Sequence, residues 1–259
     1  MLTRRTFLLL PLALLLAPVR AVAEMVRRTT PYHANAAILF GLFTLKLDGV
    51  MEDYRDAAAG TYHVTLNGKG AGIENRFESR GVIRKGRLVP TFSAISFSVR
   101  GRENVTRYTY DWERGVAHYQ HRSETFFLGH VREGGNTIPL PAGEGVDDFI
   151  TVILNYGTGV FAEGKNRTFA IRRERQAYAG TDDVREDGDR GEFAPLEFTL
   201  VRDPASGRAT TPVEFTTWSS WAKPEHPATF SFGADRRIER IDIPMILGTS
   251  LSIIFRART

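Results

Sequence analysis

The sequence predicts a mainly β fold: one antiparallel curved sheet, as a sandwich or incomplete barrel of about 10 to 14 strands, with one main helix near residues 147–157. Period-two alternation is the first observation, because Leu196, Phe198 and Leu200 alternate with their neighbours as in a half-buried antiparallel strand. Turn signals rich in Gly, Pro and Asp are the second, since they separate many such short segments.

The expected strands share this alternation or a short apolar run. In chain order they are 36–47, 60–66, 77–83, 92–99, 105–112, 116–121, 125–132, 168–173, 196–201, 213–217, 228–232, 237–243 and 251–255. Turns are expected at 67–70, 84–87, 112–115, 203–207 and 233–235.

One segment departs from the strand pattern. Apolar residues recur there at three- and four-residue spacing, which is typical of a helix: Phe149, Ile150, Val152, Ile153 and Tyr156. Asp147 and Asp148 precede them and suit the positive end of a helix. Residues 134–143 are expected to form an ordered loop that leads into this helix. A single apolar helix in a β protein commonly covers the open end or concave face of the sheet.

Residues 1–23 resemble a cleaved signal peptide, with one exported domain at 24–259. Arg4 and Arg5 precede a short apolar run, and a small-x-small triplet ends at Ala23. The run is roughly half of the about 20 residues that a membrane-spanning helix needs. We therefore expect a periplasmic or secreted protein that is not transmembrane after signal cleavage.

The export route stays open between two signals. Thr3 to Leu8 resembles the twin-arginine signal, but Leu9 stands where that signal usually has a lysine, so the general secretory route is the alternative. An outer-membrane barrel is disfavoured, because the outward positions of the expected strands carry Arg, Glu and Asp. Each arginine on a lipid-facing midplane would cost about 2 to 4 kcal/mol.

Charge and cysteine content exclude several classes of function. Three of the 34 basic residues and none of the 30 acidic ones fall in residues 1–23, which leaves 31 basic against 30 acidic residues. This near balance gives no reason to expect nucleic acid as a partner. The basic run at 172–175 is interpreted as a solvated strand face. The chain has no cysteine, so a thiol nucleophile and a thiolate metal site are excluded.

The helix and the closing strands carry a family resemblance. The stretch Asp147 to Tyr156, after a Pro-containing loop, is similar to a family of exported bacterial proteins catalogued as domain of unknown function 3108. The end of the chain, from Phe230 through Pro244 and Gly248, also resembles that family, and the resemblance covers about residues 32 to 257. It implies a secreted β-rich fold of unassigned activity and transfers no functional residue. The family often has an aromatic pair where this chain has Asn155-Tyr156.

No residue pattern indicates a catalytic site or a cofactor, and we expect a non-enzymatic protein, with a hydrolase lacking a recognisable motif as a further alternative. His118 and His121 are three apart on an expected strand and should face opposite sides of the sheet. A metal site is not expected. The weak alternative is a calcium site in the acidic loop at Asp183, Asp187 and Asp189, which does not have EF-hand spacing.

Two non-enzymatic hypotheses remain. The first is a carrier that binds a lipid or small apolar ligand in a cavity between the sheet and the helix. Its candidate ligand-binding residues are Phe92, Phe97, Tyr108, Tyr110, Trp112, Phe149, Ile153, Trp218 and Trp221. A packed core would give the same aromatic alternation. The second is an envelope module that contacts a protein or a glycan through exposed Trp218 and Trp221.

Overall fold

The protein is described here by a computed structural model that covers residues 25–38, 43–124, 130–174, 176–177, 184–185, 190–219 and 222–256. The first half contains β1 (Met25–Ile38), β2 (Phe43–Asp56), β3 (Thr61–Gly70), β4 (Ile73–Arg84), β5 (Arg87–Val99), β6 (Arg102–Asp111), β7 (Val116–Glu124) and β8 (Val131–Pro139). The second half contains α1 (Phe149–Gly157), β9 (Gly164–Arg173), β10 (Gln176–Ala177), β11 (Val184–Arg185), β12 (Gly191–Arg202), β13 (Ala209–Val213), β14 (Ala228–Phe232), β15 (Ile238–Pro244) and β16 (Ser250–Phe255).

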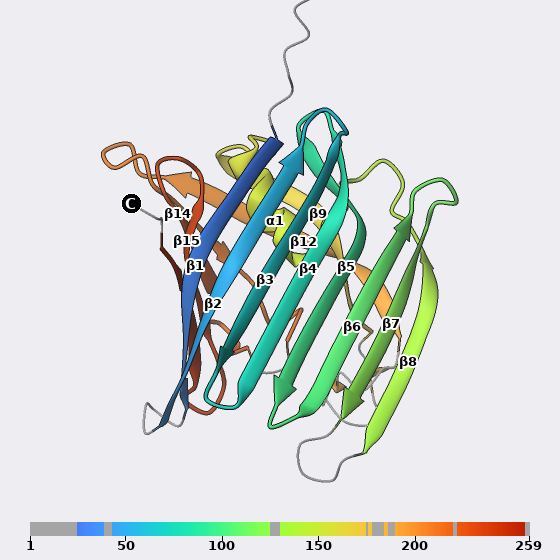
Figure 1. Cartoon of the computed structure of the whole chain (residues 1–259), viewed down its shortest axis with the longest axis vertical. Helices are drawn as coiled ribbons and strands as arrows, with labels where there is room; N and C mark the ends of the chain where they lie inside the picture. Colours follow the sequence, from blue (N-terminus) through green and yellow to red (C-terminus); the bar gives the residue numbers. More distant parts are fainter. Residues whose placement is uncertain are drawn as a thin grey trace, which may run out of the picture.

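Fourteen of the described strands form one antiparallel sheet. Its order is β8-β7-β6-β5-β4-β3-β2-β1-β16-β15-β14-β13-β12-β9, and β10 and β11 pair separately. In Figure 1 the strands β1 to β8 form a broad twisted wall, with α1, β9 and β12 behind it. The second half joins the first where β16 pairs with β1, with Tyr32 opposite Phe255. The predicted fold class, a curved antiparallel sheet with one helix, is confirmed.

The sheet curls until its β8 edge meets the start of β12. The side-chain amide of Asn136 in β8 accepts from the Gly191 N–H at 2.7 Å and donates to the Gly191 carbonyl at 3.0 Å. A Cβ at residue 191 would lie 2.6 Å from Cγ of Tyr119, so only glycine fits at this closing point. Because β8 and β9 are the edge strands of the ladder, the result is an open, β-barrel-like curl.

Helix α1 begins with a capping box. The Asp148 carboxylate accepts from the backbone N–H groups of Ile150 and Thr151, and the Thr151 hydroxyl accepts from the Asp148 N–H at 2.8 Å. These bonds satisfy backbone donors that the first helical turn leaves free. The predicted helix is confirmed, and it starts at Phe149 because the two aspartates lie outside its first turn. No helix in the described part of the chain has the length and apolar character needed to cross a membrane.

A buried ion pair fastens the helix to two strands. The Asp147 carboxylate, which is fully buried, is bound by the Arg87 guanidinium at the start of β5 and by the Thr168 hydroxyl of β9, at 2.6 Å. The Asn155 amide of α1 donates to Asp147 at 2.7 Å and also pairs with both backbone groups of Leu88. These bonds fix the position of α1 relative to β5 and β9.

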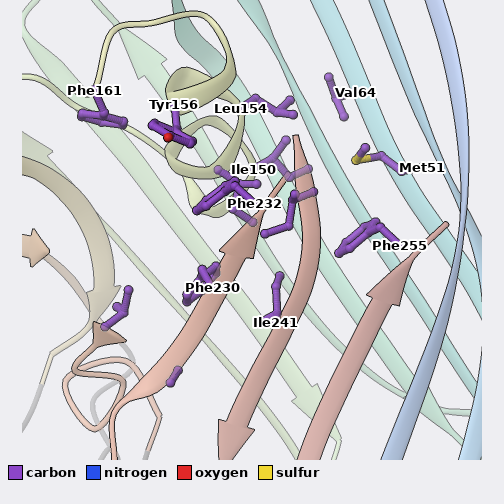
Figure 2. Packing of buried hydrophobic residues seen from close by; sticks show 14 of the residues in the cluster. Met51, Val64, Ile150, Leu154, Tyr156, Phe161, Phe230, Phe232, Ile241 and Phe255 are labelled. Atoms are coloured by element: carbon purple, nitrogen blue, oxygen red, sulfur yellow. The ribbon is translucent and has the colours of Figure 1, made fainter. Parts of the chain in front are cut away.

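The larger core cluster lies between α1 and the sheet. Figure 2 shows Ile150, Leu154 and Tyr156 of α1 beside Phe230 and Phe232 of β14. The rings of Tyr156 and Phe232 meet edge-on at 4.7 Å, a favourable aromatic geometry. A second cluster fills the space between β6, β7, β8 and β9. Helix α1 therefore packs inside the curl, as a helix in a β protein commonly does.

Several predicted boundaries are wrong. The expected strand at 36–47 is a pair of strands, with Ile38 opposite Phe43, because its apolar run spans a chain reversal. The expected turn at 67–70 belongs to β3. Its Gly68 is required because a Cβ there would lie 2.3 Å from the Tyr32 hydroxyl, and the turn follows at residues 71–72.

Two further boundaries differ from the sequence prediction. Much of the expected loop at 134–143 is the edge strand β8, in which a Cβ at Gly135 would meet the Tyr119 carbonyl at 2.5 Å. The expected strand at 213–217 ends at Val213, where β13 ends its pairing with β14. Gly135 therefore marks a place where two backbones approach closely, and it does not mark a turn. Residues 125–129 and the expected signal peptide lie outside the described residues.

Candidate functional site

A cavity of about 540 Å³ lies between α1 and the inner face of the curled sheet. Its volume falls in the range of about 300 to 1,000 Å³ that is typical of small-molecule sites. The apolar part of its wall includes Phe149, Val152, Ile153, Phe230, Phe232 and Ile253. The carrier hypothesis expects a cavity at this place, and ligand binding itself stays a prediction.

An aromatic cluster around Phe149 forms one wall. The Phe149 ring lies 5.9 Å from Phe77 of β4, 6.3 Å from Phe215 and 6.2 Å from Phe230 of β14. Phe149 thus bridges the two halves of the sheet from the start of α1. It takes this position because the capping box and the Asp147 ion pair fix the first helical turn.

The structure brings five of the predicted ligand residues to the cavity wall. These are Tyr108, Tyr110, Phe149, Ile153 and Trp218. Trp218 therefore lies against the cavity, whereas Trp221 and the three aspartates at 183, 187 and 189 lie outside the described residues. The tyrosines face inward because β6 alternates, with Tyr108 opposite Ser93 and Tyr110 opposite Ala117.

Three predicted residues do not line the cavity. Phe92 alternates with the cavity-lining Ser93 and Ile95 and so lies on the outer face, which makes its predicted inward orientation wrong. The guanidinium of the exposed Arg80 covers its ring at 4.6 Å there. The reason is parity, because Phe92 and Phe97 are five residues apart on one strand and cannot share a face. Phe97 does not line the cavity, and 39% of the residue is exposed to solvent. Trp112 donates to the Pro90 carbonyl at 2.7 Å and stacks on Tyr110.

The part of the cavity formed by β6, β7 and β9 has polar side chains in or beside its wall. Arg172 donates through Nε and Nη2 to Glu192 Oε1, at 2.8 Å and 2.7 Å. Arg173 donates to His121 Nε2, and His121 Nδ1 lies 3.0 Å from the Thr106 hydroxyl. Burial raises the pKa of the Tyr108 hydroxyl, while the neighbouring Arg173 charge opposes this rise.

Arg172 and Arg173 lie at a different place from the one that the sequence predicts. The sequence predicts a solvated strand face for both, but both border the cavity and Arg172 keeps only 22% of its side chain exposed. The interpretation is wrong because β9 enters the curl instead of lying on its surface. The available signal was the position of the run, directly after the apolar strand residues 169–171.

Two aspartates at the start of α1 have altered acidity. Burial raises the pKa of Asp148 to about 6, against the hydrogen bond from the Ser79 hydroxyl at 2.5 Å and those from the helix N–H groups. Burial also raises the pKa of Asp147, and the Arg87 charge opposes it. Their pKa values move in the same direction, whereas a general acid and base pair needs opposed shifts. Both carboxyls serve the helix start.

The histidines take the predicted faces of β7. His118 is exposed and His121 is buried, as expected for residues three apart on a strand. Among the residues whose positions the structure gives, no three His, Asp or Glu side chains are grouped so that they could hold a metal ion.

The fold and the cavity define a β-barrel-like protein with an internal, mainly apolar cavity. No family model and no curated protein matches the chain. Among solved structures, it is similar to a β-barrel-like protein of domain of unknown function 1849 from Brucella abortus. The two share 11% sequence identity with a TM-score of 0.38, over 90% of this chain and 97% of that chain.

Proposed function

We propose that this chain is an exported binding protein that holds a lipid or another apolar ligand in the cavity between α1 and the sheet. The observation that carries the proposal is the cavity of about 540 Å³ with its aromatic and aliphatic wall. Transfer of a ligand methylene group from water into such surroundings contributes about 0.8 kcal/mol. A chain of about ten methylenes therefore gains enough to offset the cost of association.

The proposed location is the periplasm or the exterior. It is supported by the signal-like pattern of residues 1–23, with Arg4 and Arg5 before a short apolar run. Membership of the family catalogued as domain of unknown function 3108 is likewise a proposal, supported by the sequence pattern of α1 and the closing strands.

The alternative hypothesis of an envelope interaction module has less support. It needs an outward-facing aromatic contact, whereas Trp218 lies against the cavity. The further alternative of a hydrolase has no catalytic motif in the sequence to support it. We therefore propose the binding function first.

Native mass spectrometry of the mature chain, purified from a bacterial periplasm, tests the proposal. We expect a stoichiometric extra mass that organic extraction removes and that lipid analysis identifies. An apo mass in the purified protein, together with no uptake of added long-chain lipids, would contradict it.

A cavity-filling variant makes this experiment specific. Ala170 of β9 is buried and lines the cavity, so Ala170→Trp should fill part of the cavity and reduce the bound mass at least about tenfold. Val201→Trp is the matched control, because Val201 lies 57% exposed on β12 and should retain the bound mass. Equal loss in both variants would show that the effect does not come from the cavity.

A further inference from the structure

A row of hydroxyl side chains crosses the inner face of the sheet beside the start of α1. Ser79 of β4 pairs with Ser93 of β5, and Ser93 pairs with Tyr108 of β6. Because directly opposite residues on neighbouring antiparallel strands share a face, the three side chains lie on the same side of the sheet. Ser93 and Tyr108 line the cavity. The mainly apolar cavity therefore has hydrogen-bonding groups in this part of its wall.

The hydroxyl of Ser79 already has partners. It donates to Asp148 Oδ2 at 2.5 Å, so the Tyr62 hydroxyl, which lies 3.0 Å from Ser79 Oγ, must donate to Ser79. The other carboxylate oxygen, Asp148 Oδ1, accepts from the N–H groups of Ile150 and Thr151. Tyr62, Ser79 and Asp148 thus form a directed chain of hydrogen bonds that ends at the first turn of α1.

Ser93, the next hydroxyl in the row, differs. It is 3% exposed, and its Oγ has no hydrogen-bond partner among the residues that the structure describes. The Tyr110 hydroxyl interacts with Ser93, which opposes the rise that burial causes in the pKa of Tyr110, but the two hydroxyls do not meet in hydrogen-bond geometry. A buried hydroxyl without a partner costs free energy, and native proteins contain few of them. Because Ser93 lines the cavity, a polar group of a bound ligand can supply this bond.

The charge near Ser93 distinguishes between polar groups. Asp148 also lines the cavity, and its negative charge contributes to the raised pKa of Tyr110. An anionic head group at Ser93 would therefore meet a like charge in a buried place. A cation gains little there, because the positive end of α1 and its N–H groups already stabilise the Asp148 carboxylate. A neutral hydroxyl both donates and accepts, and so it matches the hydroxyl of Ser93.

We propose that the cavity binds a lipid alcohol, an apolar ligand with a single hydroxyl group, and that Ser93 binds this hydroxyl. The hydrocarbon part lies against Phe77, Ile95 and Phe149, which line the cavity. Phe77 and Ile95 form the next inward pair of β4 and β5, and the Phe149 ring lies 5.9 Å from Phe77. This inference rests on the proposed function and names its ligand class.

A series of ligands of matched size tests the head group. Dodecanol, its isomer undecyl methyl ether, dodecanoate and dodecylammonium are titrated into the mature chain at pH 7.5, in competition with the neutral fluorescent probe N-phenyl-1-naphthylamine. The ether accepts hydrogen bonds but cannot donate one. We expect dodecanol to bind at least about fivefold more tightly than the ether and than either charged member.

The outcomes separate the two proposals. Binding of the ether as tightly as dodecanol would overturn the hydroxyl inference and leave the binding function standing. Tighter binding of dodecanoate or dodecylammonium than of dodecanol would do the same. Absence of binding by every member and by the probe would overturn the binding function itself.

A variant at Ser93 locates the effect. Ser93→Ala should weaken dodecanol binding about fivefold and leave binding of the ether unchanged, because it removes only the hydroxyl. Ser96→Ala is the matched control on the same strand, since the Ser96 hydroxyl donates to Glu103 at 2.7 Å and Ser96 does not line the cavity. An unchanged preference for dodecanol in folded Ser93→Ala would overturn the assignment to this residue. If that variant does not fold, the ligand series on the unmodified chain decides.

Discussion

Replacing Arg87 by methionine should lower the free energy of unfolding by about 3 to 5 kcal/mol near neutral pH. The substitution leaves the Asp147 carboxylate, which is fully buried, without its counter-charge. The Thr168 hydroxyl and the Asn155 amide still bind it, but they carry no net charge. Urea unfolding of both proteins at pH 7.5 measures the loss. The loss of free energy of unfolding should become smaller as the pH is lowered, because burial raises the pKa of Asp147 and the variant lacks the Arg87 charge that opposes this rise.

A double variant provides the control for this prediction. Arg87→Met combined with Asp147→Asn removes both charges and retains an amide beside Thr168. It should be clearly more stable than the single variant, because no isolated charge is buried. A loss below about 1 kcal/mol in the single variant would show that the pair does not hold α1 in place.

The second large effect is the pH dependence caused by Asp148. Its pKa rises from 3.8 in the unfolded chain to about 6 in the folded protein, because the carboxyl is buried. The folded state therefore binds this proton more tightly. The stabilising contribution is complete below about pH 4 and is lost as the pH rises through 6. At 1.36 kcal/mol per pKa unit, about 3 kcal/mol is lost between pH 4 and pH 7.

Substitution of Asp148 isolates this contribution. Asp148→Asn and Asp148→Ser keep an acceptor for the helix N–H groups but remove the titrating carboxyl. Both should flatten the dependence of the free energy of unfolding on pH between 4 and 7, as measured by urea unfolding across that range. The shift of Asp147 acts in the same direction, so some slope should remain. A slope as steep as that of the unmodified protein would contradict the role of Asp148.

Local sequence patterns predicted much of the fold. The alternation in 196–201 and the spacing of Phe149 and Ile153 are local signals, and both led to the right element. The capping role of Asp148 could be predicted from the sequence for the same reason, because its hydrogen-bond partners lie two and three residues away.

The remaining errors arose where distant contacts decide the structure. Gly68 and Gly135 looked like turn or loop residues, but close approach of Tyr32 and of the Tyr119 backbone requires them within strands. The inward position of Arg173 depends on how far the sheet curls, which Asn136 and Gly191 set across 55 residues. No local pattern contains that information.

The most direct test of the account is the crystal structure of the mature chain with 16-bromohexadecanoate, in which anomalous scattering locates the bromine. The proposed binding function predicts a bromine peak inside the cavity, between α1 and the inner face of the sheet. A fully occupied ligand outside the cavity, with the cavity itself empty, would contradict the binding function.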